Sequence, residues 1–485
     1  MKHYQVPENK RFVGRQHEVK TLDHLCAKPG SKILVVYGRR RVGKTELLEQ
    51  TFRTRGLLKF EGRENRSQKQ QMQFVMQQLA SYAEEPLLAR LAVEDWVEVF
   101  EEIAERTKSG PWTVYFEEVQ WLADYETDFI TALKYVWDNM FRHNQELIII
   151  LCGSSPSFMI NSVIKSKALH NRSQYELPLK ELNLIEAAAM IKHYSQNEVF
   201  DAYLTLGGIP EYLKHFDTKQ SFYLNLCKES FVPGAFFASE YERIFTSSLA
   251  SNKHYRKIIA FLSRRRFATR NEIMKHLKLK SGGTLSSELL DLEVCGFIDA
   301  YAPYHLPNGS HLVRYCITDA YMQFYFRFIQ PVAKAIEQGD FRSNPKEALN
   351  MSAYQQWLGY AFERFCRKFH RQIASILGFK GVKYHSGAYF SRRTDEEDPG
   401  FQIDLLFDRD DKVLTICEVK YSQTPISSKV IDEFEKKLQA LPNVNKKTIQ
   451  KVLITNRGID TGLERRAYFD VLIQLEDFFT SHIWD

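Results

Sequence analysis

The sequence lacks long apolar runs, low-complexity segments and a strong excess of either charge. Its longest apolar run, Leu147–Cys152, is far too short to cross a bilayer, which takes about 20 apolar residues. Glycine (23) and proline (15) are too scarce for a fibrous or disordered chain of 485 residues. We therefore expect a chain that is folded throughout, with three or four domains, because one hydrophobic core rarely serves more than about 300 residues.

Cysteine is also scarce, and its placement argues against a disulfide framework or a zinc site. The seven cysteines stand far apart, no two of them form a CxxC pair, and Cys152, Cys227 and Cys417 have apolar neighbours. This pattern is typical of buried, reduced thiols in a cytoplasmic protein. The N-terminal stretch MKHYQVPENKRFVGR lacks the apolar core of a signal peptide. We therefore expect a cytoplasmic protein without a membrane partner.

The hydrophobic pattern divides the chain into four successive units, and we find no repeat of fixed period. In the first third, short Val- and Ile-rich runs alternate with helical patterns, as in a parallel sheet built from βαβ units. We predict a multidomain α/β protein with these units: an α/β core at 1–180, a helical segment at 181–250, a small helical module at 251–320 and a second α/β domain at 345–485.

A glycine loop follows the first predicted strand, ILVVY, and precedes a helical segment, ELLEQTF. It matches G-x-x-x-x-G-K-[ST] at every fixed position and consists of Gly38, Arg39, Arg40, Arg41, Val42, Gly43, Lys44 and Thr45. The glycines let successive N–H groups point at phosphate oxygens at a helix N-terminus. Lys44 is expected to neutralise the β and γ phosphates, and the Thr45 hydroxyl to coordinate magnesium. A chance match in a basic turn is the alternative, but the flanking strand and helix favour binding of ATP with Mg²⁺.

An acidic pair, Glu117 and Glu118, stands where a second strand of the core is expected to end. In a hydrolytic site the first acid holds magnesium and the second polarises the attacking water. We therefore assign Glu117 to the metal and Glu118 to catalysis as the general base. Glu117 is one methylene longer than aspartate, which leaves the magnesium geometry and the turnover rate open. Two glutamates that merely cap the next helix are the alternative.

Two further polar side chains are candidates for the same crevice. A third strand, Leu147–Cys152, ends in Gly153-Ser154-Ser155, and the carboxyl end of a central strand lies beside the ligand in an open α/β sheet. Ser154 is therefore either a sensor of the γ-phosphate or a turn serine. Arg172, in a basic and polar segment, is either an arginine finger or a solvated loop residue.

Several segments, in this order, resemble the archaeal-type ATPases, a clade of AAA+-related STAND ATPases. The segments are FVGRQHEVKTL, YGRRRVGKTELL, EEVQWL, LCGSSPSFM and GGIPEYL. The resemblance spans roughly residues 11–245 and implies an AAA+-like P-loop core with a helical lid. It also implies that Pro210 belongs to the lid that contacts nucleotide. The residues that the resemblance places near the adenine are Phe12, Val13, Gly14 and Arg15. Glu117 stands where the family usually carries aspartate, so the resemblance supports ATP binding more firmly than fast hydrolysis.

The third unit is predicted to contain three short helices, His254–Leu262, Thr269–Leu277 and Thr284–Cys295, and then a pair of strands. This is the composition of a winged helix, with Gly283–Glu293 as its recognition helix. Short polar residues and a basic cluster that suit a DNA backbone lie nearby: Ser281, Thr284, Ser286, Ser287, Arg264, Arg265, Arg266, Arg270, Lys275, Lys278 and Lys280. The recognition helix also carries three acids, and the net charge of the chain is only +6. A module that contacts proteins instead of DNA is therefore the alternative.

The C-terminal segment FQIDLLFDRDDKVLTICEVKYS combines two carboxylates with a lysine. A strand ends near Asp404, and the next strand carries Glu418 and Lys420 on one face. Such a set suits a magnesium site beside a cation that activates water. The pattern resembles the PD-(D/E)xK nuclease superfamily, which implies a restriction-endonuclease-like fold and maps the family's helical glutamate, a metal ligand, to Glu363. A surface hairpin with an ion pair fits the same pattern, and Glu363 is otherwise a plain solvated residue.

Two functional hypotheses follow from these features. In the first, the ATPase core controls a C-terminal magnesium-dependent nuclease, and the winged helix holds DNA. In the second, ATP or ADP sets a conformational switch, and the later domains only bind partners. Glu117 favours the second hypothesis, whereas the complete Asp404/Glu418/Lys420 set favours the first. A homo-oligomer or a partner protein is compatible with both.

Overall fold

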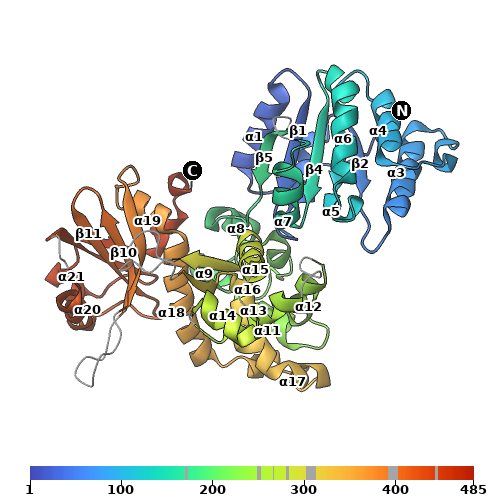
Figure 1. Cartoon of the computed structure of the whole chain (residues 1–485). Helices are drawn as coiled ribbons and strands as arrows, with labels where there is room; N and C mark the ends of the chain where they lie inside the picture. The colour runs from blue at the N-terminus through green and yellow to red at the C-terminus, as the bar shows by residue number, and fades with distance from the viewer. Residues whose placement is uncertain are drawn as a thin grey trace.

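The computed structural model describes residues 1–169, 173–247, 253–265, 267–279, 283–301, 313–390, 402–442 and 446–484. The chain forms three lobes in sequence order (Figure 1), which run from blue at the N-terminus through green and yellow to red at the C-terminus. A parallel sheet forms the first lobe and a mixed sheet forms the third, so the predicted multidomain α/β class is confirmed. All seven cysteines are free thiols. Within the described ranges, no helix is long and apolar enough to span a membrane.

The N-terminal lobe is built on a five-stranded sheet of order β2-β3-β4-β1-β5, in which every neighbouring pair is parallel. The strands are β1 (Lys32–Tyr37), β2 (Gly56–Glu61), β3 (Trp112–Glu117), β4 (Ile148–Gly153) and β5 (Ser173–Pro178). The sequence predicted β1, β3 and β4, whose runs are nearly continuous apolar residues. It missed β2 and β5 because their sequences, GLLKFE and SQYELP, include charged residues.

Helices cover both faces of this sheet. Successive side chains of a strand point to opposite faces, so each apolar strand contributes to two separate cores. In β1, Leu34 and Val36 pack into one core, whereas Ile33 and Val35 pack into another. Both cores exclude water, so the carboxyl edge of the sheet is the part that polar side chains line. The helices are α1 (Gln16–Ala27), α2 (Lys44–Phe52), α3 (Gln68–Ala83), α4 (Trp96–Arg106), α5 (Val119–Leu122), α6 (Asp128–Asn139) and α7 (Pro156–Phe158).

The middle lobe consists of the elements from α8 to α17 and starts with a run of helices, as the sequence predicts. Side-chain caps at Asn183 and Ser195, each in a capping box, begin the first two helices. The helices are α8 (Leu184–Met190), α9 (Gln196–Leu206), α10 (Pro210–Leu213), α11 (Phe222–Phe231), α12 (Phe236–Ser247), α13 (Lys253–Ser263), α14 (Arg270–Leu277), α15 (Thr284–Val294), α16 (Ala320–Phe324) and α17 (Ala333–Gln338).

The three helices and the strand pair predicted for the winged helix are present in the middle lobe as α13, α14, α15, β7 and β8. A third, very short strand, β6, completes an antiparallel sheet of order β6-β8-β7. The strands are β6 (Ala268–Thr269), β7 (Ile298–Tyr301) and β8 (Arg314–Ile317). β6 escaped prediction because two residues give no hydrophobic period.

The C-terminal lobe is a mixed sheet of order β13-β12-β11-β10-β9. β10 pairs antiparallel with β9 and β11, and β12 pairs parallel with β11 and β13. Its strands are β9 (Tyr384–Phe390), β10 (Gln402–Arg409), β11 (Val413–Lys420), β12 (Thr448–Thr455) and β13 (Val471–Ile473). Its helices are α18 (Met351–Lys368), α19 (His370–Ile376), α20 (Lys429–Ala440) and α21 (Thr461–Arg466).

Two helices of the C-terminal lobe lie on opposite faces of its sheet. α18 contributes Phe362 and Phe365 to the core that contains Leu405 of β10, whereas α20 contributes Phe434 to the core that contains Leu406. α18 also contacts α9 of the middle lobe, in addition to β10 and β11, so this helix connects the middle lobe to the third lobe.

Short 3₁₀ and π helices connect these elements throughout the described residues. They are η1 (Leu88–Arg90), η2 (Phe141–His143), η3 (Met159–Ile164), η4 (Tyr325–Ile329), η5 (Gln330–Val332), η6 (Pro345–Ala348), η7 (Leu475–Phe479) and η8 (Ser481–Ile483).

Candidate functional site

The glycine loop joins the carboxyl end of β1 to the first turn of α2. Gly43 has a φ of 88°, and a Cβ at Gly38 would lie 2.2 Å from the Leu179 carbonyl oxygen. The loop therefore requires glycine at both positions. Lys44 Nζ donates to the carbonyl oxygens of Gly38 (2.9 Å) and Arg39 (3.1 Å). These bonds hold the ammonium group over the concave side of the loop, at the N-terminus of α2.

Thr45, in the first turn of α2, meets the acid at the end of β3. Its hydroxyl donates to Glu117 Oε1, so a hydroxyl and a carboxylate oxygen converge beside Lys44. This is the donor set that Mg²⁺ uses in a phosphate-loop site, and the residues fit that ion. Lys59 Nζ on β2 lies 2.6 Å from Glu117 Oε2 and 2.8 Å from Glu49 Oε1. Burial opposes the charge of Lys59, but the two carboxylates outweigh it and raise the pKa of Lys59.

Glu118 lies next to this pair and has a left-handed backbone, with a φ of 53°. Such a conformation is uncommon for a residue with a side chain and clusters at functional sites. Glu118 Oε2 accepts hydrogen bonds from the Ser154 N–H (3.1 Å), the Ser154 hydroxyl (2.6 Å) and the Gln120 amide (2.6 Å). Ser154 is almost fully buried at the end of β4. The structure thus brings together both predicted residues and adds Gln120.

The N-terminal motif and the lid residue also lie against the loop. The Arg15 guanidinium donates to the carbonyl oxygens of Val42 (2.7 Å) and Lys180 (2.6 Å) and is buried. A Cβ built on Gly43 would lie 3.7 Å from Pro210 Cγ. Both segments that the resemblance places at the nucleotide therefore border the phosphate loop.

A second cluster lies on the C-terminal sheet, where β10 and β11 run side by side. The prediction that a strand ends near Asp404 is wrong, because the apolar residues Leu405–Phe407 continue β10 to Arg409. Asp404 Oδ2 accepts the Val419 N–H (3.1 Å), and Lys420 Nζ lies 3.0 Å from Glu418 Oε1. Asp404 and Glu418 are both buried. Burial, and then the nearby Glu363 and Glu418, raise the pKa of Asp404 to about 7.

Glu363 on α18 faces this cluster, although its place in the helical pattern also suited a solvated residue. The Gln402 amide donates to Glu363 Oε2 (3.0 Å) and to Asp404 Oδ1 (3.1 Å), which bridges the two acids. On the other side, Lys437 Nζ of α20 donates to both oxygens of Glu418 (2.8 and 2.7 Å). In this arrangement the cluster does not fit a metal ion. Over the described residues, no group of three or more His, Cys, Asp or Glu side chains is placed to hold one.

Comparisons with known families agree with the first of these two sites. A model described as an ATPase domain predominantly from Archaea matches residues 12–216, which contain the phosphate loop, Glu117, Glu118 and Ser154. Residues 12–216 are an archaeal-type ATPase domain. A second model, for archaeal and bacterial proteins of unknown function, matches residues 325–435. The chain therefore joins this ATPase domain to a C-terminal domain of a family without a known activity.

One curated relative and two solved structures illustrate what the chain is similar to. An uncharacterised protein of Methanocaldococcus jannaschii is 28% identical over 415 residues, which covers 84% of this chain and 87% of that protein. The Walker-type ATPase of Pyrococcus abyssi is 18% identical, with a TM-score of 0.47, and the match covers 67% of this chain and 98% of that one. The ORC2 protein of Aeropyrum pernix is 13% identical, with a TM-score of 0.39, over 70% of this chain and 97% of that one.

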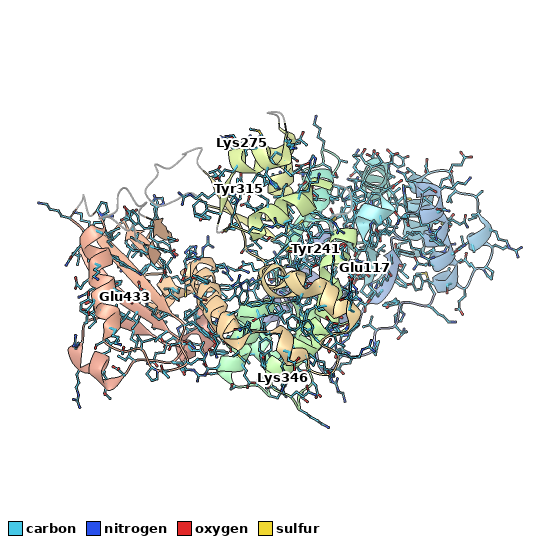
Figure 2. All side chains as sticks on the ribbon, turned by 90° about the horizontal axis from the view of Figure 1, so that it is seen from below. Glu117, Tyr241, Lys275, Tyr315, Lys346 and Glu433 are labelled. Atoms are coloured by element: carbon cyan, nitrogen blue, oxygen red, sulfur yellow. The ribbon has the colours of Figure 1, made fainter. Side chains whose placement is uncertain are left out.

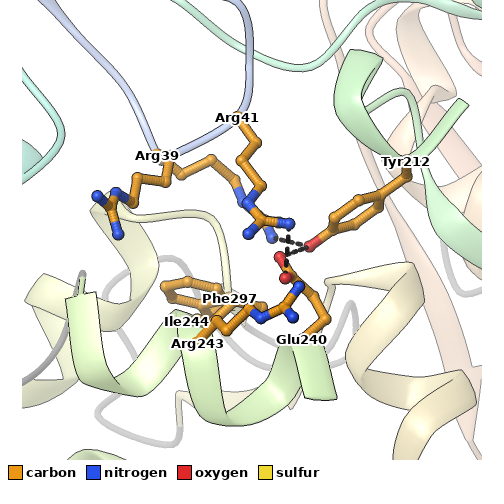
Figure 3. Close-up of a pocket in the computed structure, with 8 residues that line it drawn as sticks. Arg39, Arg41, Tyr212, Glu240, Arg243, Ile244 and Phe297 are labelled. Atoms are coloured by element: carbon orange, nitrogen blue, oxygen red, sulfur yellow. Dashed lines mark hydrogen bonds and ion pairs between the residues drawn. The ribbon is translucent and has the colours of Figure 1, made fainter. Parts of the chain in front are cut away.

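The side chains of Arg39 and Arg41 reach from the phosphate loop into the middle lobe (Figure 3). Arg41 Nη1 lies 2.6 Å from Glu240 Oε2 on α12, and Arg39 pairs with Asp319 ahead of α16. Both guanidinium groups therefore contact acids of the middle lobe. A small pocket lies between the two parts, lined by Arg39, Arg40, Arg41, Tyr212, Glu240, Arg243, Ile244 and Phe297.

The basic cluster of the middle lobe is only partly within the described residues. Exposed members include Lys275 and Lys278, and Arg270 Nε donates to Ser286 Oγ (3.0 Å). Figure 2 shows Lys275 at an outer edge of the lobe, far from Glu117 and Glu433. The predicted recognition helix, α15, contacts α7 of the ATPase domain, so part of its surface is covered. Ser281, Arg266 and Lys280 lie outside the described residues.

Arg172, the predicted arginine finger, lies outside the described residues. Three side chains that were not predicted from the sequence contact the predicted acids: Lys59, Gln120 and Lys437. A charged residue inside the apolar run LLKF marks Lys59 as a candidate partner of a buried acid. No sequence signal identifies Lys437, because only the packing of α20 on the sheet brings it to Glu418.

Proposed function

We propose that the chain binds ATP with Mg²⁺ at the phosphate loop and hydrolyses it slowly. The observation that carries this proposal is the convergence of Lys44, Thr45 and Glu117 at the carboxyl edge of the parallel sheet. Thr45 and Glu117 would hold magnesium, which supplies charge neutralisation at the β and γ phosphates. Lys44 would exchange its bonds with the loop carbonyls for bonds with the phosphates, and the loop N–H groups would bind the remaining oxygens.

Glu118 is the proposed general base, with Ser154 and Gln120 as the groups that position it. A water molecule between Glu118 and the γ-phosphate would lose its proton to this carboxylate. In the described arrangement Oε2 of Glu118 already accepts three hydrogen bonds, so Ser154 competes with the water. Lys59 holds one oxygen of Glu117, which weakens the attraction of this carboxylate for magnesium. Both features favour slow turnover.

Replacement of Lys44 by alanine tests nucleotide binding directly. We expect Lys44→Ala to bind a fluorescent ATP analogue at least about 100-fold more weakly, because charge-assisted bonds to phosphate are lost. Lys20→Ala, which removes an exposed charge from α1, is the matched control and should bind within about twofold of the unaltered chain. Normal ATP binding by Lys44→Ala would refute the proposal.

We further propose that the ATPase acts on DNA through the winged helix and the C-terminal domain. Two observations support it. Lys275 and Lys278 are exposed on and just after α14. Glu363 of α18 meets three residues of the C-terminal sheet, Asp404, Glu418 and Lys420. Plasmid DNA incubated with Mg²⁺ or Mn²⁺, with and without ATP, tests cleavage against Asp404→Ala. Cutting by the unaltered chain alone supports a nuclease. Equal cutting by both proteins, or none, contradicts it.

A nucleotide-controlled switch that cuts no DNA is the second candidate function. The ion pairs of Arg39 and Arg41 with the middle lobe favour it, because they give the phosphate loop a direct contact with α12 and Asp319. Nucleotide-dependent proteolysis of the middle lobe, without any cleavage of DNA, is the result expected for this function. In both cases we propose the domain bounds 1–180, 181–250, 251–320 and 345–485.

A further inference from the structure

Lys437 is a cation that the sequence pattern of the C-terminal cluster does not include. It projects from α20, and its Nζ donates to Glu418 Oε1 at 2.8 Å and to Oε2 at 2.7 Å. Lys420 Nζ lies 3.0 Å from Glu418 Oε1 and 3.0 Å from Glu433 Oε2. Glu418 is only 1% exposed, so these two ammonium groups satisfy a carboxylate that has little access to water.

Cationic side chains already surround the carboxylates of the cluster without a metal ion. Its three carboxylates belong to Glu363, Asp404 and Glu418. Its three cationic side chains are Lys420, Lys437 and Arg367, the last of which lies 3.6 Å from Glu363 Oε2 and donates to the Asp404 carbonyl oxygen (3.2 Å). A divalent cation would add two positive charges beside these three cationic side chains and would compete with Lys437 for the same two oxygens of Glu418.

We propose that Lys437 is a built-in counter-ion of Glu418, which keeps divalent cations out of this cluster until the lysine side chain is displaced. This role of Lys437 rests on the proposed nuclease function, because that function is the reason for a metal ion to bind at this cluster. It concerns a positioning residue, because Lys437 acts through Glu418. Its geometry differs from that of Lys420, whose Nζ lies 3.0 Å from Glu418 Oε1 and equally close, at 3.0 Å, to Oε2 of the exposed Glu433.

Binding of Mn²⁺ to the full chain without nucleotide, followed by electron paramagnetic resonance, tests this inference. We expect Lys437→Met to bind Mn²⁺ roughly tenfold more tightly than the unaltered chain, because a charge that competes for Glu418 is removed. Lys437→Arg keeps the charge and should stay close to the unaltered chain. Lys436→Met removes an exposed charge from the same helix and is the matched control. The gain should vanish when Asp404→Asn is added to Lys437→Met.

Three results would overturn the inference: equal Mn²⁺ affinity in Lys437→Met and the unaltered chain, an equal gain in Lys436→Met, or a gain that survives Asp404→Asn. Lys437→Gln serves as a second neutral variant if Lys437→Met does not fold, as judged by thermal unfolding. The metal assay does not depend on DNA cleavage. A chain that gains Mn²⁺ through Lys437→Met but never cuts DNA refutes the nuclease and leaves the role of Lys437 intact.

Discussion

Arg41 Nη1 of the phosphate loop lies 2.6 Å from Glu240 Oε2 of α12, which joins the ATPase domain to the middle lobe. The Tyr212 hydroxyl also donates to Glu240 (3.0 Å), and the carboxylate is 1% exposed. Burial raises the pKa of Glu240, while Arg41 opposes this change. The backbone of Arg41 is left-handed, with a φ of 70°. The same residue therefore forms a turn of the phosphate loop and contacts the middle lobe through its side chain.

Neutralisation of Glu240 tests the strength of this connection. We expect Glu240→Gln to lower the free energy of unfolding by about 2 kcal/mol, because it removes one partner of a largely buried ion pair while the hydrogen bond from Tyr212 remains possible. Chemical denaturation measures the change. Glu242→Gln is the control. Glu242 lies two residues after Glu240 in α12 and forms an exposed ion pair with Arg256, so this change should alter the free energy of unfolding by less than about 0.5 kcal/mol.

Glu118→Gln separates nucleotide binding from turnover. The amide keeps the size of the side chain but cannot accept a proton, so the hydrolysis rate should fall by about 10²-fold or more. ATP affinity should stay within about threefold, because Glu118 bonds to Ser154 and Gln120 and not to the loop. Phosphate release and equilibrium titration with an ATP analogue measure the two quantities. Unchanged hydrolysis would exclude Glu118 as the base.

The Asp201–Tyr421 contact makes stability depend on pH. The Tyr421 hydroxyl donates to Asp201 Oδ1 (2.7 Å) and links α9 to the residue after β11. Burial raises the pKa of Asp201 from 3.8 to about 7, although this hydrogen bond opposes the change. Between these two pKa values, the carboxyl group keeps its proton in the folded chain but loses it in the unfolded chain. Its contribution to the free energy of unfolding is therefore complete below pH 4 and is lost as the pH rises through 7.

Asp201→Asn removes this titration. Between pH 4 and pH 8, the unaltered chain should lose about 1–3 kcal/mol of unfolding free energy relative to Asp201→Asn. Urea unfolding of both proteins at several pH values gives the difference. A difference that grows in favour of the unaltered chain at high pH has the wrong sign for a buried, protonated Asp201.

DNA binding by the middle lobe predicts a specific dependence on salt. Lys275 and Lys278 are exposed on and just after α14. If both contact phosphates, Lys275→Gln with Lys278→Gln should weaken DNA binding roughly tenfold and reduce the slope of log affinity against log salt by about 1.8. Fluorescence anisotropy over a range of salt concentrations measures the slope. Lys346→Gln is the control, because Figure 2 shows Lys346 and Lys275 on opposite sides of the lobe. A similar loss in this control points to non-specific charge effects.

The phosphate-loop site was largely predictable because its chemistry is local. Gly38, Gly43 and Lys44 follow one another within a single strand–loop–helix, and a continuous apolar strand predicts where the loop sits in a parallel sheet. Glu118 and Ser154 end two other predicted strands, and parallel strands bring their carboxyl ends to one edge. Strand alternation likewise placed Glu418 and Lys420 on one face.

Tertiary packing alone decided which partners these groups have. Lys59 reaches Glu117 from β2, Glu240 reaches Arg41 from α12, and Lys437 reaches Glu418 from α20. Each pair consists of a buried carboxylate and a cation from another element, and a buried charge requires such a partner wherever the fold supplies one. Hydrophobic period and motif spacing report the neighbours along a chain and the face of an element. They do not report which distant cation the packed core brings within 3 Å of an acid, and that contact decides how readily each acid is available to a metal or to water.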